Sequence, residues 1–324
     1  MTNPFQRIDV TQWPIIRRET LGQSPTTWVR DPELPHVAEN EWLFKPVETH
    51  GDGTVQGTDW AEKASSELGR LLGVPTAEIE LAVNAGEMGS ISRNVRPKGF
   101  DMQPGSLWLD ADPRLSYSAS KSTKSKRVRG ATPGYNFPDI ALSLDSVASP
   151  PGFDELMHLD GLGVFSGYLM LDALIANRDR HEENWSVLRP TTGSSRASLA
   201  PSYDLAGTLG YQLTDESRER FLTGHDFSVA KWAARGDAWR FGTGDVGKQS
   251  LVELARHALH SAGETAELHW IGKLDSFTTS DAEGLFERLP QMSEASRKFA
   301  LALIATNAER ILDGYRNSAA RQRH

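Results

Sequence analysis

Three polar side chains in the middle of the chain are of the types that carry out phosphoryl transfer. Asp179 and Asn184 lie in Asn-Arg-Asp-Arg-His-Glu-Glu-Asn-Trp-Ser (177–186), and Asp204 lies in Tyr-Asp-Leu (203–205). In kinase-type sites one carboxylate orients the attacking hydroxyl, while an amide oxygen and a second carboxylate hold magnesium on the nucleotide phosphates. We therefore expect Asp179 to act as the catalytic base, and Asn184 and Asp204 to bind Mg²⁺ through hard oxygen atoms.

The flanking sequence predicts how these residues come together. An apolar helical pattern over 165–176 ends where the motif begins. Two short apolar runs, 185–188 and 197–200, follow on either side of a turn and read as a β-hairpin. Because a hairpin returns the chain to its starting point, Asn184 and Asp204 can share one ion although twenty positions separate them.

The other residues of the motif have less certain roles. We expect His181 to take a partly buried supporting position, in which it orients Asp179 or lies near a phosphate. Asn177 is expected to brace the loop, whereas Arg178 and Arg180 are interpreted as solvated surface charges. Taken singly, each Asp or Asn could also be a loop residue that caps backbone groups.

A kinase site also needs a cation on the phosphates, and Lys45 is the candidate. It lies near the end of a β-type run, Glu-Trp-Leu-Phe-Lys (41–45), ahead of a predicted helix that contains Glu62. A strand lysine is oriented in kinases by a helix glutamate. We expect Glu62 to pair with Lys45, with Glu67 as the alternative partner.

Two loops could contact an anionic ligand. Gly22 and Ser24 lie in Leu-Gly-Gln-Ser-Pro-Thr-Thr (21–27), whose backbone amides could cover phosphates, although a plain turn explains the same residues. The segment 121–129 has five basic residues in nine. It reads as a solvated loop or as a loop that folds over an anionic substrate or nucleotide.

The pattern of elements indicates an α+β chain in two parts. Residues 1–98 alternate β-rich runs, such as 26–30, 79–83 and 90–95, with one helix over 60–72. Residues 99–150 read as irregular, and the remainder is mostly helical, most clearly over 249–262 and 293–315. We expect a small N-lobe over 1–98 and a larger, mostly helical C-lobe over 99–324.

Composition narrows the class of protein. The 324 residues are 24% charged and 38% apolar, which is typical of a soluble globular chain. A net charge of −8 argues against broad nucleic-acid binding. The absence of cysteine excludes thiolate chemistry, and neither a signal peptide nor a run long enough to cross a membrane is recognisable, so a cytoplasmic location is expected.

At these residues the chain resembles the HipA-like kinases, a bacterial family related to protein and phosphoinositide kinases. The stretch 177–186 is similar to the family's catalytic loop, and 203–205 resembles the metal-binding motif that replaces Asp-Phe-Gly. Phe44-Lys45-Pro46 resembles the ATP-binding strand, and Glu62 together with the following stretch 68–75 resembles the family's N-lobe helix. The resemblance implies a bilobal protein-kinase-like fold, the cofactors ATP and Mg²⁺, and an antitoxin-like regulator as a partner.

We therefore expect an ATP-dependent kinase whose acceptor is a protein serine or threonine. Alternatives are a kinase for a small molecule or a peptide natural product, and a nucleotide-binding pseudokinase, which would not need the full set of polar residues. A phosphoesterase could use Asp179, His181 and Asp204 on a metal. It would need further ligands, for which His225 and Asp226 are the nearby candidates.

Overall fold

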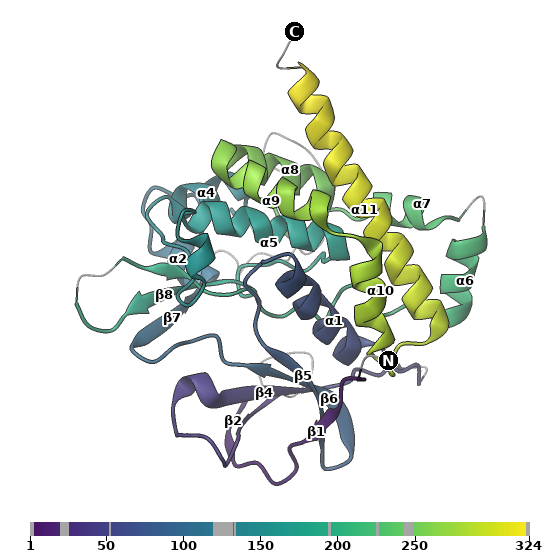
Figure 1. Cartoon of the computed structure of the whole chain (residues 1–324). Helices are drawn as coiled ribbons and strands as arrows, with labels where there is room; N and C mark the ends of the chain where they lie inside the picture. The colour runs from purple at the N-terminus through teal and green to yellow at the C-terminus, as the bar shows by residue number, and fades with distance from the viewer. Residues whose placement is uncertain are drawn as a thin grey trace.

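A β-sheet and a group of helices form the two ends of the molecule, as Figure 1 shows. The computed structural model describes residues 3–19, 26–51, 53–118, 132, 134–193, 196–224, 227–242 and 249–321. Within these ranges no helix is long and apolar enough to cross a membrane. The mixed α+β class expected from the sequence is confirmed, while the division at residue 98 stays a prediction.

The sheet has six strands in the order β1-β5-β6-β4-β3-β2. They are β1 (Arg7–Asp9), β2 (Ile15–Glu19), β3 (Thr26–Arg30), β4 (Glu41–Pro46), β5 (Ile79–Asn84) and β6 (Glu87–Arg93), with the 3₁₀ helix η1 (Ala38–Asn40) before β4. β1 pairs with β5 in parallel, and the other neighbouring pairs are antiparallel. The sequence did not predict β1, which has three residues, or β2, whose Ile15 and Ile16 are both exposed.

Helix α1 (Thr58–Leu71) lies between the sheet and the other helices (Figure 1). Because it is covered on both sides, even its charged residues Glu62 and Lys63 are buried. Buried charges must be paired, and the Lys63 ammonium donates to Glu67, Glu80 and the carbonyl of Ile79. The paired α1 charges therefore hold the helix in one orientation against β5.

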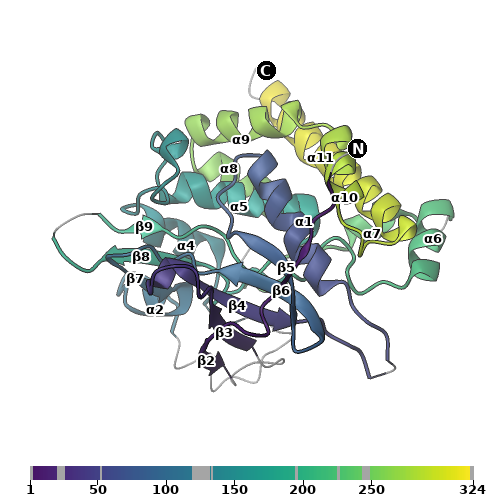
Figure 2. The ribbon, with the colours of Figure 1, turned by 60° about the horizontal axis from the view of Figure 1, so that its bottom comes forward.

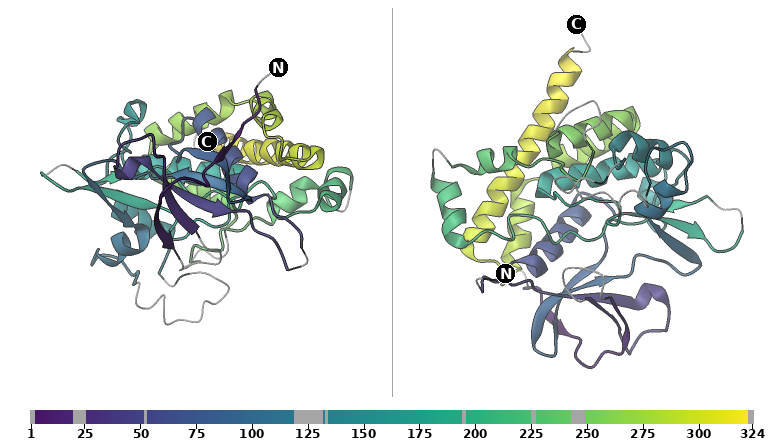
Figure 3. Two further views of the ribbon diagram at one scale, coloured as in Figure 1. Left: turned by 90° about the horizontal axis from the view of Figure 1, so that it is seen from below. Right: turned by 180° about the vertical axis from the view of Figure 1, so that it is seen from behind.

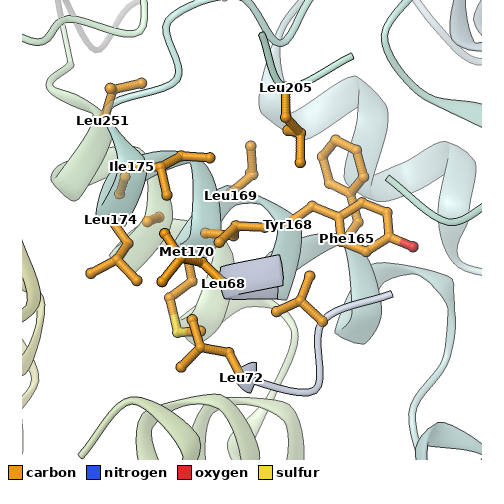
Figure 4. Packing of buried hydrophobic residues seen from close by; sticks show 14 of the residues in the cluster. Leu68, Leu72, Phe165, Tyr168, Leu169, Met170, Leu174, Ile175, Leu205 and Leu251 are labelled. Atoms are coloured by element: carbon orange, nitrogen blue, oxygen red, sulfur yellow. The ribbon is translucent and has the colours of Figure 1, made fainter. Parts of the chain in front are cut away.

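Helix α5 (Gly161–Ile175) forms the centre of the hydrophobic core (Figure 4). It is apolar on all sides, as expected of a helix surrounded by other elements. Gly167 allows a close approach, because a Cβ there would lie 2.4 Å from the ring of Trp270. The indole of Trp270 also donates to the carbonyl of Gly163 at 2.7 Å. This packing fixes the direction of α5 and so the place where the chain leaves it.

The remaining helices complete the helical part of the molecule, and some of them contact α5 directly. They are α2 (Gly105–Asp110), α4 (Phe137–Leu144), η2 (Asp154–Leu156), α6 (Asp215–Thr223), α7 (Val229–Ala234), α8 (Leu251–Ser261), α9 (Glu264–Ser276), α10 (Thr279–Glu287) and α11 (Glu294–Arg321). The C-terminal part of α11 extends beyond the other helices when seen from behind (Figure 3). The helices predicted over 249–262 and 293–315 correspond to α8 and α11.

A smaller sheet contains β7 (Phe100–Pro104), β8 (Ser186–Pro190) and β9 (Ser198–Leu199), in that order. The predicted hairpin is present as the antiparallel pair β8 and β9. The expectation of irregular structure over 99–150 was wrong, because this stretch contains β7, α2 and α4. β7 pairs with β8 some eighty positions later, so its stabilising partner is not visible in the local sequence. Figure 2 shows β7 and β8 beside α2 and α4.

Candidate active site

The 177–184 loop begins at a left-handed residue that turns the chain away from α5. Ala176 has φ 56° and ψ 42°, and its amide donates to the carbonyl of Asp172. This conformation costs a residue with a side chain about 1–2 kcal/mol. Here the methyl group is buried against Val229 and Phe299, among others, and burial of one such group returns about 0.8 kcal/mol. The buried methyl group therefore offsets part of the conformational cost at Ala176.

Asp204 reaches the same region from the other end of the hairpin. The antiparallel pairs of β8 and β9 return the chain, and the amide of Ala200 donates to the carbonyl of Ser186 at 2.9 Å. The Tyr203 hydroxyl contacts Ser186 at 2.7 Å and donates to the carbonyl of Glu183. Asp204 itself has φ 61°, in the left-handed region. The hairpin therefore attaches Asp204 to the end of the 177–184 loop.

Lys45 joins the sheet, α1 and the hairpin in one charged cluster. Its ammonium donates to Glu62 at 2.9 Å and to Asp204 at 2.7 Å. The second oxygen of Glu62 accepts from the hydroxyl of Ser90, which lies opposite Lys45 in the β4–β6 register. Glu67 is directed elsewhere, toward Lys63 and Arg70. Of the two glutamates considered from the sequence, Glu62 is thus the one that contacts Lys45.

The charges in this cluster reinforce one another. Burial lowers the pKa of Lys45, but the carboxylates of Asp204 and Glu62 outweigh it, so the pKa is raised overall. The charge of Lys45 lowers the pKa of Asp204 by more than burial raises it. Lys45 is therefore an ammonium ion and Asp204 a carboxylate at neutral pH. Because 39% of the Asp204 side chain is exposed, solvent screens part of this attraction.

Asp179 is held by an arginine that was not identified from the sequence. The Nε of Arg240 donates to Oδ1 of Asp179 at 2.6 Å, and a second guanidinium nitrogen contacts the same oxygen. The backbone amide of Asp179 donates to the side chain of Asn177, which accordingly braces the loop. The Asn184 side-chain amide donates to the carbonyl of Asp179 at 2.9 Å. Three separate contacts therefore fix Asp179.

Arg180 is buried beneath the loop, so the expectation that it is a solvated charge was wrong. Its guanidinium forms two 2.8 Å hydrogen bonds with the carboxylate of Asp172, and both side chains are only 2% exposed. It also donates to the carbonyl of Asn184 and the hydroxyl of Ser202. Arg178, in contrast, is 48% exposed and pairs with Asp237. The sequence did contain a signal for this pair, because Asp172 lies within the otherwise apolar α5 and needs a partner.

The backbone amide of His181 donates to the carbonyl of Asp179 at 2.8 Å, but the imidazole and the Asp179 carboxylate are not hydrogen-bonded to each other. Its Nε2 is 3.9 Å from Oδ2 of Asp179, while its Nδ1 accepts from the amide of Glu183. Burial lowers the pKa of His181, opposed mainly by the charge of Asp179. The imidazole is therefore neutral at pH 7. Its side chain is 24% exposed, which fits a partly buried position, but Arg240 rather than His181 holds Asp179.

A cavity of about 710 Å³ opens beside Lys45 and Asp204. Its volume lies in the range of small-molecule sites. The walls come from the large sheet, the connection between β6 and β7, β7 itself, and the residues on either side of the β8–β9 hairpin. They include Trp28, Leu43, Asn94, Val95, Met102, Gln103 and Tyr203. The β6–β7 connection was not identified as part of a site from the sequence. Its Pro97 and Gly99 indicate only that a strand ends and a loop begins between the two sheets.

The donor atoms in this region suit a magnesium ion. Asp204 supplies a carboxylate. The side-chain nitrogen of Asn184 donates to the carbonyl of Asp179, so its side-chain oxygen is the atom left to bind a metal. Mg²⁺ takes oxygen ligands from one or two side chains and completes its shell with phosphates and water. In the part of the chain that the structure describes, no three His, Asp or Glu residues are grouped to hold a metal. A metal site made by the protein alone, as a phosphoesterase would need, is therefore not supported there.

Several expected contributors lie outside the described residues. They are Gly22 and Ser24 of the possible phosphate loop, the basic segment 121–129, and the possible phosphoesterase ligands His225 and Asp226.

The chain was compared with known families and structures. The profile of the HipA-like C-terminal domain matches residues 21–270, more than half of the chain. The chain belongs to this family. No curated protein sequence gives a significant match.

Solved structures agree in fold. CtkA, a proinflammatory kinase of Helicobacter pylori, is 16% identical with a TM-score of 0.66, over 98% of this chain and 100% of that one. HipA of Shewanella oneidensis, from a toxin–antitoxin complex with HipB and operator DNA, is 12% identical with a TM-score of 0.53. That match covers 93% of this chain and 68% of HipA. The bilobal kinase-like fold is thus confirmed, and the family supports a kinase.

Proposed function

We propose that the protein transfers the γ-phosphoryl group of ATP to a serine or threonine hydroxyl of a protein. The observation that carries the proposal is the ion-paired Lys45 and Asp204 at one cavity, with Glu62 holding Lys45 and Asp179 in the adjoining loop. Phosphoryl transfer depends on positioning and charge neutralisation more than on covalent chemistry. This arrangement provides both.

Lys45 binds the phosphates and Glu62 sets its direction. The raised pKa of Lys45 keeps it charged, and the Glu62 side chain is 1% exposed, so it holds the ammonium without competition from water. The contact with Ser90 prevents Glu62 from rotating away. The nucleotide base and ribose would occupy the cavity between the sheet, the connection that follows β6, and β7.

Asp179 accepts the proton of the acceptor hydroxyl. Its side chain is 44% exposed, so an acceptor can reach it. Asn184 and Asp204 would hold a magnesium ion, which would neutralise part of the phosphate charge. The buried Arg180–Asp172 pair keeps the loop in place, so that the three polar side chains lie correctly before substrates bind.

One experiment tests the nucleotide site. Lys45→Met removes a charged hydrogen bond to the phosphates, which is worth about 1.5–3 kcal/mol. We expect the Kd for Mg-ATP, measured by calorimetry, to rise about 10- to 100-fold by this estimate. The control is Lys298→Met, because Lys298 is exposed and pairs only locally with Glu294. Equal affinities of the two variants would contradict the assignment of Lys45.

A second experiment tests the acceptor. The protein is incubated with γ-labelled ATP, magnesium and a bacterial protein extract, and the labelled proteins are hydrolysed to identify phosphoamino acids. Labelled phosphoserine or phosphothreonine that appears with wild type and disappears with Asp204→Asn supports the proposal. Label that appears only in small molecules would instead favour the small-molecule kinase.

The proposal includes a protein regulator. Its support is the structure of HipA, which was solved together with HipB. Co-purification of this chain with the product of an adjacent gene would test the idea, and a monomeric, unpartnered enzyme in its native cell would contradict it.

A further inference from the structure

Residues 236–242, between α7 and the start of α8, form a segment that packs against the 177–184 loop. Two ion pairs connect them, and each part supplies one arginine and one aspartate. Arg178 of the loop contacts Asp237 of the segment, and Arg240 of the segment contacts Asp179 of the loop. Neither pair was expected from the sequence, because the partners are about sixty positions apart.

The segment is also held at its ends. The amide of Gly242 donates to the carbonyl of Tyr135, and the rings of Tyr135 and Phe241 lie 5.0 Å apart. The Tyr135 hydroxyl in turn donates to the carbonyl of Arg180 within the loop. At the other end the amide of Ala238 donates to the carbonyl of Gln249. Contacts on both sides of Arg240 therefore hold its backbone in place beside the loop.

Arg240 engages one oxygen of Asp179 and leaves the other open. Both guanidinium contacts go to Oδ1, while Oδ2 lies 3.9 Å from Nε2 of His181 and has no closer polar contact among the described residues. The Arg240 side chain is 15% exposed and lies 4.0 Å from the ring of Trp239. A planar guanidinium stacked in this way gives a fixed direction to a carboxylate.

We propose that Arg240 is a positioning residue for phosphoryl transfer, which directs Oδ2 of Asp179 toward the acceptor hydroxyl. The Arg178–Asp237 pair holds the segment in register with the loop, so that Arg240 stays in place. The inference rests on the proposed kinase function. A misplacement of about 1 Å in a catalytic group can cost on the order of 100-fold in rate.

The test compares turnover with nucleotide affinity. Arg240→Gln is expected to lower kcat for transfer from γ-labelled ATP roughly 10- to 100-fold. Its Kd for Mg-ATP should stay within about twofold, because Lys45 and Asp204 are unchanged; this also shows that the variant is folded. Arg240→Lys should recover part of the activity through its charge. The control is Arg235→Gln, an exposed arginine at the end of α7.

A charge exchange tests the second ion pair. Arg178→Asp and Asp237→Arg should each lower kcat, and the double variant should recover most of the loss, because the pair is restored in reverse. An effect of either substitution that does not involve the Arg178–Asp237 pair would not be repaired by the other.

The outcomes separate the two claims. If wild type transfers phosphate but Arg240→Gln retains kcat within twofold, or the charge exchange restores nothing, the inference is overturned and the kinase function stands. If wild type neither binds Mg-ATP nor transfers phosphate, the proposed function fails, and the inference fails with it.

Discussion

Removal of Arg180 should be among the most costly single substitutions in this protein. Its guanidinium makes four hydrogen bonds, two of them to the carboxylate of Asp172. Arg180→Met would leave that carboxylate buried, with the side chain of Asn177 as its remaining side-chain donor among the described residues. Breaking a buried ion pair by removal of one partner costs about 3–5 kcal/mol. At about 2–4 °C per kcal/mol, Tm should fall by roughly 10 °C.

Thermal melts followed by circular dichroism provide the measurement. The matched control is Arg316→Met, because Arg316 also pairs with two aspartates, Asp275 and Asp313, but is 62% exposed. An exposed pair is worth about 0–1 kcal/mol, so this variant should melt within about 3 °C of wild type.

The double variant Asp172→Leu/Arg180→Met distinguishes a buried charge from simple loss of packing. Replacement of a whole buried pair by apolar residues is often neutral or stabilising. We expect the double variant to be more stable than Arg180→Met alone. Equal melting of Arg180→Met and Arg316→Met, or strictly additive effects in the double variant, would refute this account of the loop.

Further predictions concern the charged cluster and the start of the loop. Glu62→Gln should raise the Kd for Mg-ATP, measured by calorimetry, about tenfold, since a hydrogen bond to a charged group is worth about 1.5–3 kcal/mol. The control Glu67→Gln should leave the Kd unchanged. Because the folded pKa of His181 is lowered below 6.5, the unfolded chain binds more protons below that pH, so stability should fall as the pH drops through 6.5. The lowered pKa of Asp204 adds a further loss below pH 4 by the same linkage. A His181→Asn variant that loses stability over the pH 6.5–5 range as steeply as wild type would contradict the first assignment. Ala176→Gly should change the unfolding free energy by less than about 1 kcal/mol, because relief of the left-handed strain offsets the loss of a buried methyl group.

The residues that could be located from the sequence are those whose chemistry requires a short spacing or a regular element. Asp179 and Asn184 are close in sequence, and the hairpin that brings Asp204 back has a recognisable pattern of apolar runs. Lys45 and Glu62 belong to a strand and a helix that were both predictable. In each case local periodicity contains the information.

Contacts between distant segments could not be predicted in this way. Arg240 lies sixty-one positions from Asp179, in a short segment without periodicity. Asp172 within the apolar α5 signals that a buried partner is needed, but no local pattern identifies Arg180 as that partner. Likewise β7 pairs with a strand far along the chain, so its few residues read as irregular.

The most direct measurement of the central claim is phosphate transfer by wild type and Asp179→Ala. Each protein is incubated with γ-labelled ATP, magnesium and a bacterial protein extract as the source of acceptor, and the label incorporated into protein is counted. Asp313→Ala, at an exposed position, is the control. Loss of a general base typically costs about 10²- to 10⁴-fold, so we expect wild type and Asp313→Ala to transfer phosphate equally and Asp179→Ala to transfer at least about 100-fold less. Transfer by Asp179→Ala at the wild-type rate, or none by wild type, would contradict the account.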